Sequence, residues 1–210
     1  MLLCWSAKGG SGATVVAAAL SLVLSTTRSV TLADLGGDIP AALGLPEPAG
    51  PGLTDWLASP DADAAALARL AIDVNPSLRL LPRGAAPMPT QPRWADLVPA
   101  LSDVDEEVVI DGGTGEPPDE LDRAVDQSLL VIRPCYLAMR RLVSMRSRPT
   151  GVIVISEPGR NLRSIDLAHS IGAPVVAQVP FDPAVFNAVN AGLLAGRLTR
   201  SLSHALRDIA

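Results

Sequence analysis

Residues 6 to 14, SAKGGSGAT, combine the residue types that bind phosphate groups in proteins. Gly9, Gly10 and Gly12 permit backbone conformations and close approaches that a Cβ would block. The stretch follows an apolar run of strand length and precedes a helical run, which places several backbone amides at the positive end of a helix dipole. The pattern predicts an anion-binding loop, and an ordinary glycine-rich turn between a strand and a helix is the alternative.

Two side chains of this loop add to the prediction. Lys8 is the only lysine in a chain with 17 Lys and Arg residues, and a compact ammonium fits a tight phosphate site where the planar guanidinium of arginine does not. The Thr14 hydroxyl falls where a phosphate-binding loop supplies a ligand to Mg²⁺. The position at which such a loop normally carries a second lysine that reaches the phosphates is occupied by Ala13.

The elements that must position this loop are predicted from apolar runs and turn residues. Runs of strand length recur with helical stretches between them, which is typical of a parallel sheet covered by helices on both faces. We expect one α/β domain over residues 1–210, doubly wound, with about seven strands and with proline-rich and glycine-rich surface loops at 44–52 and 82–93. The expected strands are 2–6, 29–34, 78–82, 107–111, 128–133, 151–156 and 174–180, and the expected helices are 13–26, 62–73, 93–101, 136–146, 162–171, 183–190 and 197–209.

The composition limits the classes of function. A net charge of -5 argues against non-specific nucleic-acid binding, so DNA is not an expected partner. The arginine-rich run 133–148 is expected to form a solvated helix face, with a contact to phosphate or to a partner as the alternative. Cys4 and Cys135 are expected to be reduced core residues of a cytoplasmic protein. His169 and His204 lie far apart, and no spacing of Cys, His and carboxylate residues predicts a transition-metal site.

Four segments, in order along the chain, resemble the motifs of one family. KGGSGAT (8–14) resembles the deviant Walker A motif of the MinD/ParA family of P-loop ATPases, and VTLADLGGD (30–38) resembles its second-strand motif. EEVVIDGGTG (106–115) is similar to the family's Walker B strand, and VPFDPAVFNAVNAGLL (179–194) to its segment beside the nucleotide base. The matches span nearly the whole chain and imply a P-loop fold, with the nucleotide at the carboxyl ends of the strands.

The resemblance also implies cofactors and site residues. ATP and Mg²⁺ would bind, and two subunits would enclose the nucleotide in a homodimer in which Lys8 reaches the nucleotide of the partner subunit. Thr14 and Asp111 would hold Mg²⁺, while Lys8 and Asp34 would be the catalytic residues, with Asp34 supporting the metal waters or the attacking water. The implied nucleotide-binding residues are Lys8, Gly9, Gly10, Ser11, Gly12, Ala13, Thr14, Val15, Pro180 and Asp182.

Two departures from the family's motifs bear on hydrolysis. Ala13 removes a positive charge that would stabilise the transferred phosphoryl group. Gly36 stands where the second-strand motif carries a second aspartate that orients the attacking water, and we expect Asp38 to replace that aspartate only if the turn shifts. Because phosphoryl transfer depends almost entirely on positioning and charge, we expect binding to survive and hydrolysis to be weak or absent.

The resemblance implies a role in spatial organisation, in which the protein positions a larger assembly. DLGGDIPAALGL (34–45), PGLTDWL (51–57) and LRLLPRG (78–84) are most similar to segments of CpaE/TadZ-type proteins of Tad pilus assembly. This similarity implies pilus or secretion machinery as the partner, and a cytoplasmic location that includes the inner face of the membrane or a cell pole.

The last predicted helix has one basic face and one apolar face. Arg197, Arg200, His204 and Arg207 recur at steps of three and four residues, opposite a stripe of leucines. We expect the stripe to pack on the domain, because the helix has no bulky aromatic anchor; an anionic membrane surface is the alternative.

Two other functions remain open from the sequence. One is a slow but active ATPase that uses a displaced carboxylate together with Lys8 and cycles on a membrane or on DNA. The other is a nucleotide-free interaction module that keeps the fold and meets its partner through the run 133–148 or through the last helix.

Overall fold

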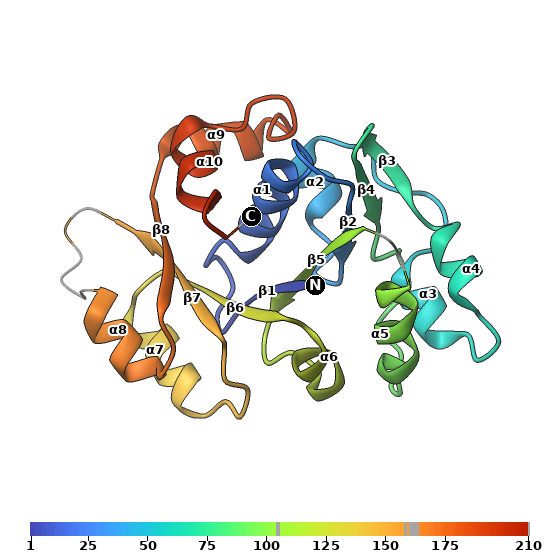
Figure 1. Ribbon diagram of the computed structural model, residues 1–210, viewed down its shortest axis with the longest axis horizontal. Helices are drawn as coiled ribbons and strands as arrows, with labels where there is room; N and C mark the ends of the chain where they lie inside the picture. The colour runs from blue at the N-terminus through green and yellow to red at the C-terminus, as the bar shows by residue number, and fades with distance from the viewer. Residues whose placement is uncertain (104–105, 158, 160–163, 210) are drawn as a thin grey trace.

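An eight-stranded sheet forms the centre of the molecule (Figure 1). The computed structural model describes residues 1–103, 106–157, 159 and 164–209. The strand order is β3-β4-β2-β5-β1-β6-β7-β8, and every neighbouring pair is parallel except β3 and β4. The strands are β1 (Leu2–Ser6), β2 (Val30–Asp34), β3 (Ile72–Asn75), β4 (Leu78–Leu81), β5 (Glu107–Thr114), β6 (Gln127–Ile132), β7 (Gly151–Ser156) and β8 (Val175–Pro180).

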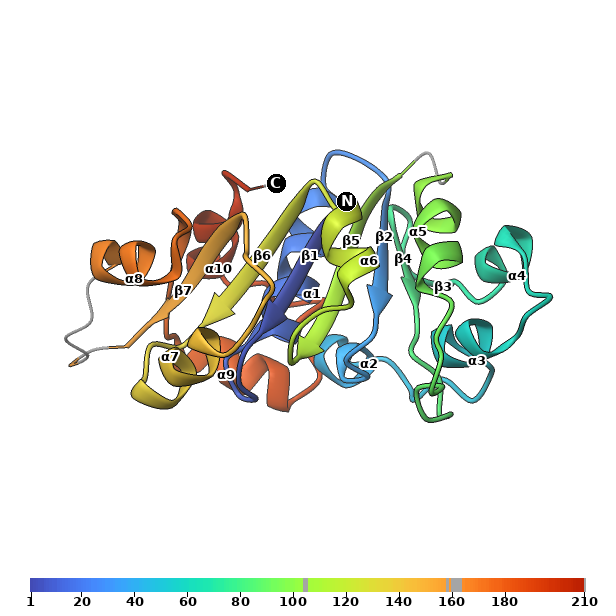
Figure 2. The same cartoon turned by 90° about the horizontal axis from the view of Figure 1, so that it is seen from below.

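The central strands are apolar on both sides because helices cover both faces of the sheet. In β1, Leu2 and Cys4 pack into the core on one face, while Leu3 and Trp5 pack into the core on the other. Figure 2 shows α6 and α7 on the near face of the strands, with α1 behind them. The helices are α1 (Ala13–Leu24), α2 (Ile39–Leu43), α3 (Leu53–Ala58), α4 (Ala64–Ala68), α5 (Trp94–Ser102), α6 (Asp119–Ala124), α7 (Tyr136–Val143), α8 (Ser164–Ile171), α9 (Pro183–Asn190) and α10 (Arg200–Leu206).

The helix predicted at 62–73 is partly wrong, because its last residues belong to an eighth strand that was not predicted. The alanine-rich stretch 62–73 was expected to be helical throughout, but α4 ends at Ala68 and β3 begins at Ile72. A tight turn at 75–77, in which the Ser77 amide donates to the Asn75 side chain at 2.8 Å, folds β3 back against β4 as an antiparallel edge. The spacing of apolar residues does not predict this strand pairing, because the pairing depends on the turn between β3 and β4.

The other differences from the sequence prediction concern short elements and element ends. Helices α2, α3 and α6 have five or six residues, which is too few to show a helical period in the sequence. Strand β5 continues three residues beyond the expected Asp111, to Thr114. Leu162 and Arg163, the first two residues of the helix expected at 162–171, lie outside the described residues.

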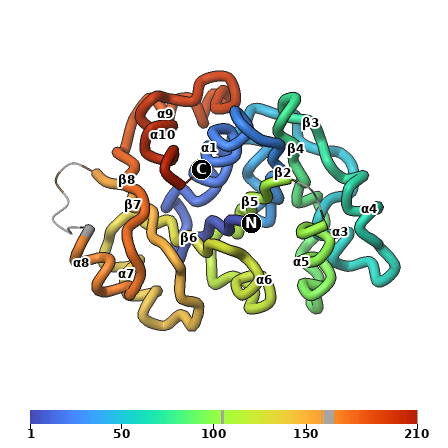
Figure 3. Tube along the Cα trace, in the orientation of Figure 1, coloured from blue at the N-terminus to red at the C-terminus, as the bar shows by residue number. Residues whose placement is uncertain are grey.

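The last helix packs on the domain, as predicted. Leu202 and Leu206 of α10 are buried, together with Leu194, in the same core as α1. The tube in Figure 3 shows this helix returning to lie beside α1, from which it is far removed in sequence. Arg200 and Arg207 face solvent. No helix among the described residues has the length and apolar character needed to cross a membrane.

Removing the buried leucine of α10 should test this packing. Leu206→Ala deletes methyl groups from a fully buried site and should lower the free energy of unfolding by about 2–4 kcal/mol in urea denaturation. Arg207→Ala, at an exposed neighbouring position, is the control and should change the free energy of unfolding by less than about 0.5 kcal/mol. Equal stability of the two variants would show that α10 is not docked.

Candidate functional site

The glycine-rich loop between β1 and α1 presents unpaired backbone amides. Gly10 and Gly12 have φ values of 76° and 94°, a region that a side chain would strain, and Gly12 is the residue before α1. Among the described residues, the amides of positions 9–14 donate no hydrogen bond. Free donors at the beginning of a helix form a concave anion site, so the loop has the geometry expected of it.

Side chains inside the loop hold its shape. The Ser11 hydroxyl donates to the Lys8 carbonyl at 2.7 Å, and the Ser6 hydroxyl donates to the same carbonyl at 3.2 Å. The Lys8 ammonium donates to the Gly9 carbonyl at 3.0 Å, so in a single subunit this side chain folds onto its own loop. Ala13 is buried in the first turn of α1 and supplies no charge to the loop.

Two buried carboxylates lie beside the loop. Asp34 is the last residue of β2 and lies beside Asp111, its register partner within β5. Both side chains are fully buried. Burial raises the pKa of Asp34 from an ordinary 3.8 to about 6, although the Gly37 and Ile39 amides donate to this carboxylate at 2.6 and 3.2 Å. Burial also raises the pKa of Asp111, against the lowering effect of the Thr14 hydroxyl.

The residues present fit a Mg²⁺ ion held together with phosphate. Asp111 Oδ2 is buried and has no hydrogen-bond partner among the described residues. An oxygen of this kind meets a cation or its bound water without losing any existing contact. No three His, Cys, Asp or Glu side chains in the described ranges gather closely enough to hold a metal ion by themselves. In P-loop proteins phosphate oxygens and water complete the coordination, so Thr14 and Asp111 would suffice as the protein's share.

The missing second aspartate has a steric explanation in the fold. A Cβ on Gly36 would lie 2.8 Å from Asp111 Oδ2 and 3.4 Å from the Gly113 Cα, because the turn after β2 packs directly against this part of β5. An aspartate therefore does not fit at position 36 in this arrangement. Asp38, in contrast, lies near enough that its charge contributes to the raised pKa of both buried carboxylates.

An apolar pocket of about 380 Å³ adjoins the loop on the side of β7, β8 and α9. It contains several of the residues predicted to bind nucleotide, namely Gly10, Ser11, Gly12, Val15, Pro180 and Asp182. The structure adds Ile155, and it also brings in Arg133, from the arginine-rich run, and Phe181, Val185 and Phe186, from the segment 179–194, which were not singled out as binding residues. The Arg133 guanidinium lies over the Phe181 ring, 5.3 Å from its centre, and pairs with Glu157. The predicted residues Lys8, Gly9, Ala13, Thr14, Asp34 and Asp111 lie outside the pocket, in the loop and at the carboxylates.

Two further arginines at this edge of the sheet escaped the sequence analysis. Arg83, two residues after β4, donates to the Gly36 carbonyl at 3.0 Å and lies against Gly37, so it holds the turn that follows Asp34. Arg141 of α7 approaches the Ala7 carbonyl at 3.5 Å, which places one member of the run 133–148 next to the loop. Position was an available signal for Arg83, because residues directly after parallel strands meet at the ligand-binding edge; Arg141 belongs to the run 133–148, for which a phosphate contact was the alternative prediction.

The raised pKa of Asp34 should appear as pH-dependent stability of the protein without nucleotide. Because the native carboxyl binds its proton more tightly than the unfolded one, its contribution is complete below about pH 4 and is lost as pH rises through 6. A shift of this size corresponds to about 3 kcal/mol. Asp34→Asn should flatten the fall in unfolding free energy between pH 4 and 6. Asp61→Asn, which alters an exposed carboxylate, should keep the parent profile, and an equally steep Asp34→Asn profile would contradict the assignment.

Restoring the missing acid should destabilise the protein. Gly36→Asp forces a side chain against Asp111 and should lower the free energy of unfolding by about 1–3 kcal/mol in urea denaturation. Gly36→Ala should show much of the same loss, because the first carbon already meets the carboxylate. Gly50→Ala is the matched control, since nothing lies within 4 Å of the added carbon. A Gly36→Asp protein as stable as the parent would mean that the turn after β2 has room for the side chain.

Solved structures similar to this chain include a ParA family ATPase and MinD cell division proteins. A ParA family ATPase from Chlorobium tepidum superposes with a TM-score of 0.79 at 21% identity, over 99% of this chain and 97% of that one. The MinC:MinD cell division protein complex of Aquifex aeolicus gives 0.75 at 19% identity, covering 99% and 92%. The septum site-determining protein MinD of Pyrococcus horikoshii, in complex with Mg-ADP, gives 0.74 at 18% identity, covering 99% and 93%.

Comparison of the amino-acid sequence with known families and curated proteins gives no match. The glycine-rich loop after β1 and the adjacent carboxylates Asp34 and Asp111 nevertheless occur on a mainly parallel sheet, as the motifs implied. The chain therefore has the fold of the ParA and MinD ATPases.

Proposed function

We propose that this chain binds ATP with Mg²⁺, dimerises around the nucleotide and positions a larger assembly, with weak or absent hydrolysis. The observation that carries the proposal is the placement of the free amides of positions 9–14 beside Asp111, whose Oδ2 has no partner among the described residues. The amides would bind the phosphates, and the carboxylate would bind the cation that accompanies them.

The charges at the site make the cation necessary. Asp34, Asp38 and Asp111 raise the local negative charge, and Ala13 contributes no compensating ammonium. A triphosphate would be repelled from such a site unless a divalent cation neutralised part of its charge. Binding should accordingly depend on Mg²⁺ more strictly than at a loop that retains its lysine.

The adjoining pocket would receive the nucleotide base. Its walls are mainly apolar, and Phe181 offers an aromatic ring already stacked on the Arg133 guanidinium. A flat base gains from such a surface by burial and stacking. The polar groups of the β8 to α9 turn, including Asp182, lie at the same pocket and would fix the orientation of the base.

Dimerisation would bring Lys8 to the nucleotide of the partner subunit. Lys8 is partly exposed, and among the described contacts its ammonium donates only to the Gly9 carbonyl of its own loop, so little is lost when it turns outward. A ParA/MinD fold and a MinD neighbour crystallised with MinC support self-association and a protein partner as the general mode of action. The similarity to CpaE/TadZ-type segments favours pilus or secretion machinery as that partner, at the inner face of the membrane or a cell pole.

A slow active ATPase is the second candidate, and Asp38 favours it. The Asp38 charge contributes to the raised pKa of both buried carboxylates, so Asp38 would be the residue that orients the attacking water. Without the loop lysine, its turnover would still lack a principal source of transition-state charge. Continuous Mg²⁺-dependent phosphate release that is abolished by Asp38→Asn would support this candidate over the non-hydrolysing one.

Calorimetric titration of ATP with and without Mg²⁺, with light scattering on the same samples, tests the proposal. We expect a dissociation constant on the order of micromolar, only with Mg²⁺, and a doubling of the mass. Lys8→Ala should prevent the doubling, whereas Arg69→Ala, which alters an exposed cation on another part of the surface, should not. No heat and no change in mass at millimolar ATP would refute nucleotide binding and favour the nucleotide-free module.

A further inference from the structure

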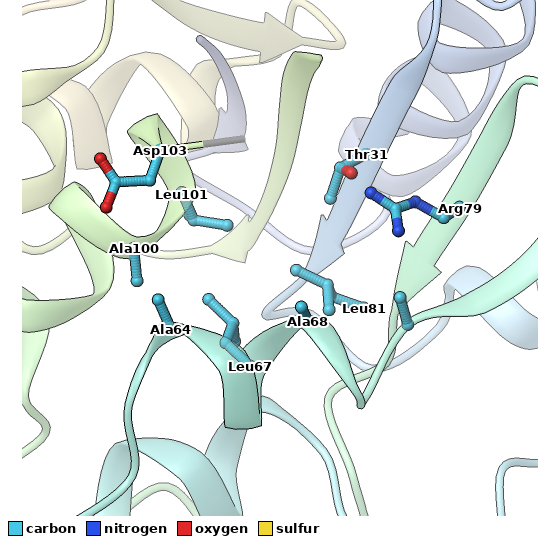
Figure 4. Close-up of a pocket in the computed structure, with 10 residues that line it drawn as sticks. Thr31, Ala64, Leu67, Ala68, Arg79, Leu81, Ala100, Leu101 and Asp103 are labelled. Atoms are coloured by element: carbon cyan, nitrogen blue, oxygen red, sulfur yellow. The ribbon is translucent and has the colours of Figure 1, made fainter. Parts of the chain in front are cut away.

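A second pocket lies apart from the nucleotide-site candidates and shares no residue with them. It has a volume of about 130 Å³ and lies between α4, α5 and the strands β2 and β4. Thr31 and Arg79 are each the second residue of their strand, so this pocket reaches the edge of the sheet opposite Asp34. Figure 4 shows side chains from the two helices and the two strands around one open space.

Three sides of the pocket are apolar. Alanines of α4 and α5, with Leu67, Leu81 and Leu101, form these walls. The short side chains of Ala64, Ala68 and Ala100 leave space between the two helices that Leu67 and Leu101 line but do not fill. An apolar cavity of about 150 Å³ in another protein holds a benzene molecule, so a space of this size suits a single aromatic ring or a branched aliphatic group.

The remaining side of the pocket is polar, and most of its polar groups already form hydrogen bonds with Glu106. The Thr31 hydroxyl donates to one oxygen of Glu106, and the Arg79 guanidinium donates to the other at 2.6 Å. A guanidinium has five N–H donors, and Glu106 is the one partner of Arg79 among the described residues. The wall therefore retains donor capacity on Arg79, whose Nε is buried with no hydrogen-bond partner among the described residues, whereas the Thr31 hydroxyl already donates its one hydrogen to Glu106.

The charge around the pocket selects against an anion. Glu106 balances Arg79, and the Asp103 carboxylate lies at the side formed by α5. A carboxylate ligand would meet the Glu106 carboxylate, which already shares the single Arg79 charge; Asp103, exposed at the end of α5, adds a second negative charge whose carboxylate is directed away from the open space in Figure 4. A neutral acceptor, such as a hydroxyl or carbonyl oxygen, would take the spare Arg79 donor without this repulsion.

We propose that this pocket binds a small neutral molecule of the size of one aromatic ring, with a single oxygen acceptor directed at Arg79. The ring lies against the alanines and leucines of α4 and α5, and the oxygen accepts from the guanidinium. The site is independent of the proposed nucleotide function, so each can fail without the other.

Phenol, with benzene and benzoate for comparison, tests the proposal by titration into ¹⁵N-labelled protein while backbone amide shifts are followed. We expect phenol to bind in the millimolar range and to shift amides of α4, α5 and the first residues of β2 and β4. Benzoate should bind at least about tenfold more weakly, because of the repulsion by Asp103 and Glu106. Benzene should also bind more weakly, since it has no acceptor for Arg79.

Two pairs of variants separate the site from a general surface effect. Ala68→Leu fills the pocket and should weaken phenol binding at least about tenfold, whereas Ala65→Leu, on the same helix but outside the pocket, should leave it unchanged. Arg79→Lys keeps a positive charge for Glu106 but removes the planar fork, so it should weaken phenol and leave benzene unaffected. Equal phenol binding by Ala68→Leu and the parent, benzoate as tight as phenol, or shifts confined to residues 9–16 and 179–189 would each overturn the proposal.

Discussion

Two carboxylates buried side by side impose the main constraint on this structure. Asp34 and Asp111 are neighbours on adjacent parallel strands, and removing two like charges from water carries a large cost unless hydrogen bonds and nearby groups offset it. The amides of Gly37, Ile39 and Gly113 supply those bonds. The turn after β2 must therefore fold back tightly on the end of its own strand, and this determines which residues it can contain.

The close contact between the turn after β2 and the residues Asp111 and Gly113 of β5 follows from that constraint. Gly36 lies against Asp111 with no room for a side chain, and Arg83 from the end of β4 holds the turn through the Gly36 carbonyl. Thr54 of α3 in turn binds the Arg83 carbonyl through both its amide and its hydroxyl. The loops after β2, β4 and β5 and the beginning of α3 thus form one connected support for the carboxylates. Gly36, which replaces the second aspartate of the motif, is part of this support, because it contacts Asp111 and accepts a hydrogen bond from Arg83.

The two edges of the sheet differ in chemistry for a simple reason. At the carboxyl edge, loops and helix beginnings present free amides and converging polar groups, which suit a charged ligand such as the proposed Mg²⁺–ATP. At the other edge, Thr31, Arg79 and Glu106 bond to one another and leave the Arg79 Nε as a buried spare donor, and small residues on α4 and α5 leave an apolar space. A ligand there would gain mainly from burial, and one at the carboxyl edge mainly from electrostatics.

The sequence by itself determined the elements with a strong local signal and their order. Residues Leu2–Ser6, Gly151–Ser156 and Pro183–Asn190 form a strand, a strand and a helix with the predicted bounds, because their periodicity and end signals are local. The same logic located the glycine loop, and it predicted Asp34 and Asp111 to lie at the ligand-binding edge, since the carboxyl ends of parallel strands meet there. Only the tertiary structure decided the hairpin of β3, the contact of Gly36 with Asp111, the nearness of Asp38 and the inclusion of Phe181 and Arg133 in the pocket. These features depend on how segments of the chain pack against one another, and local residue patterns do not predict such packing.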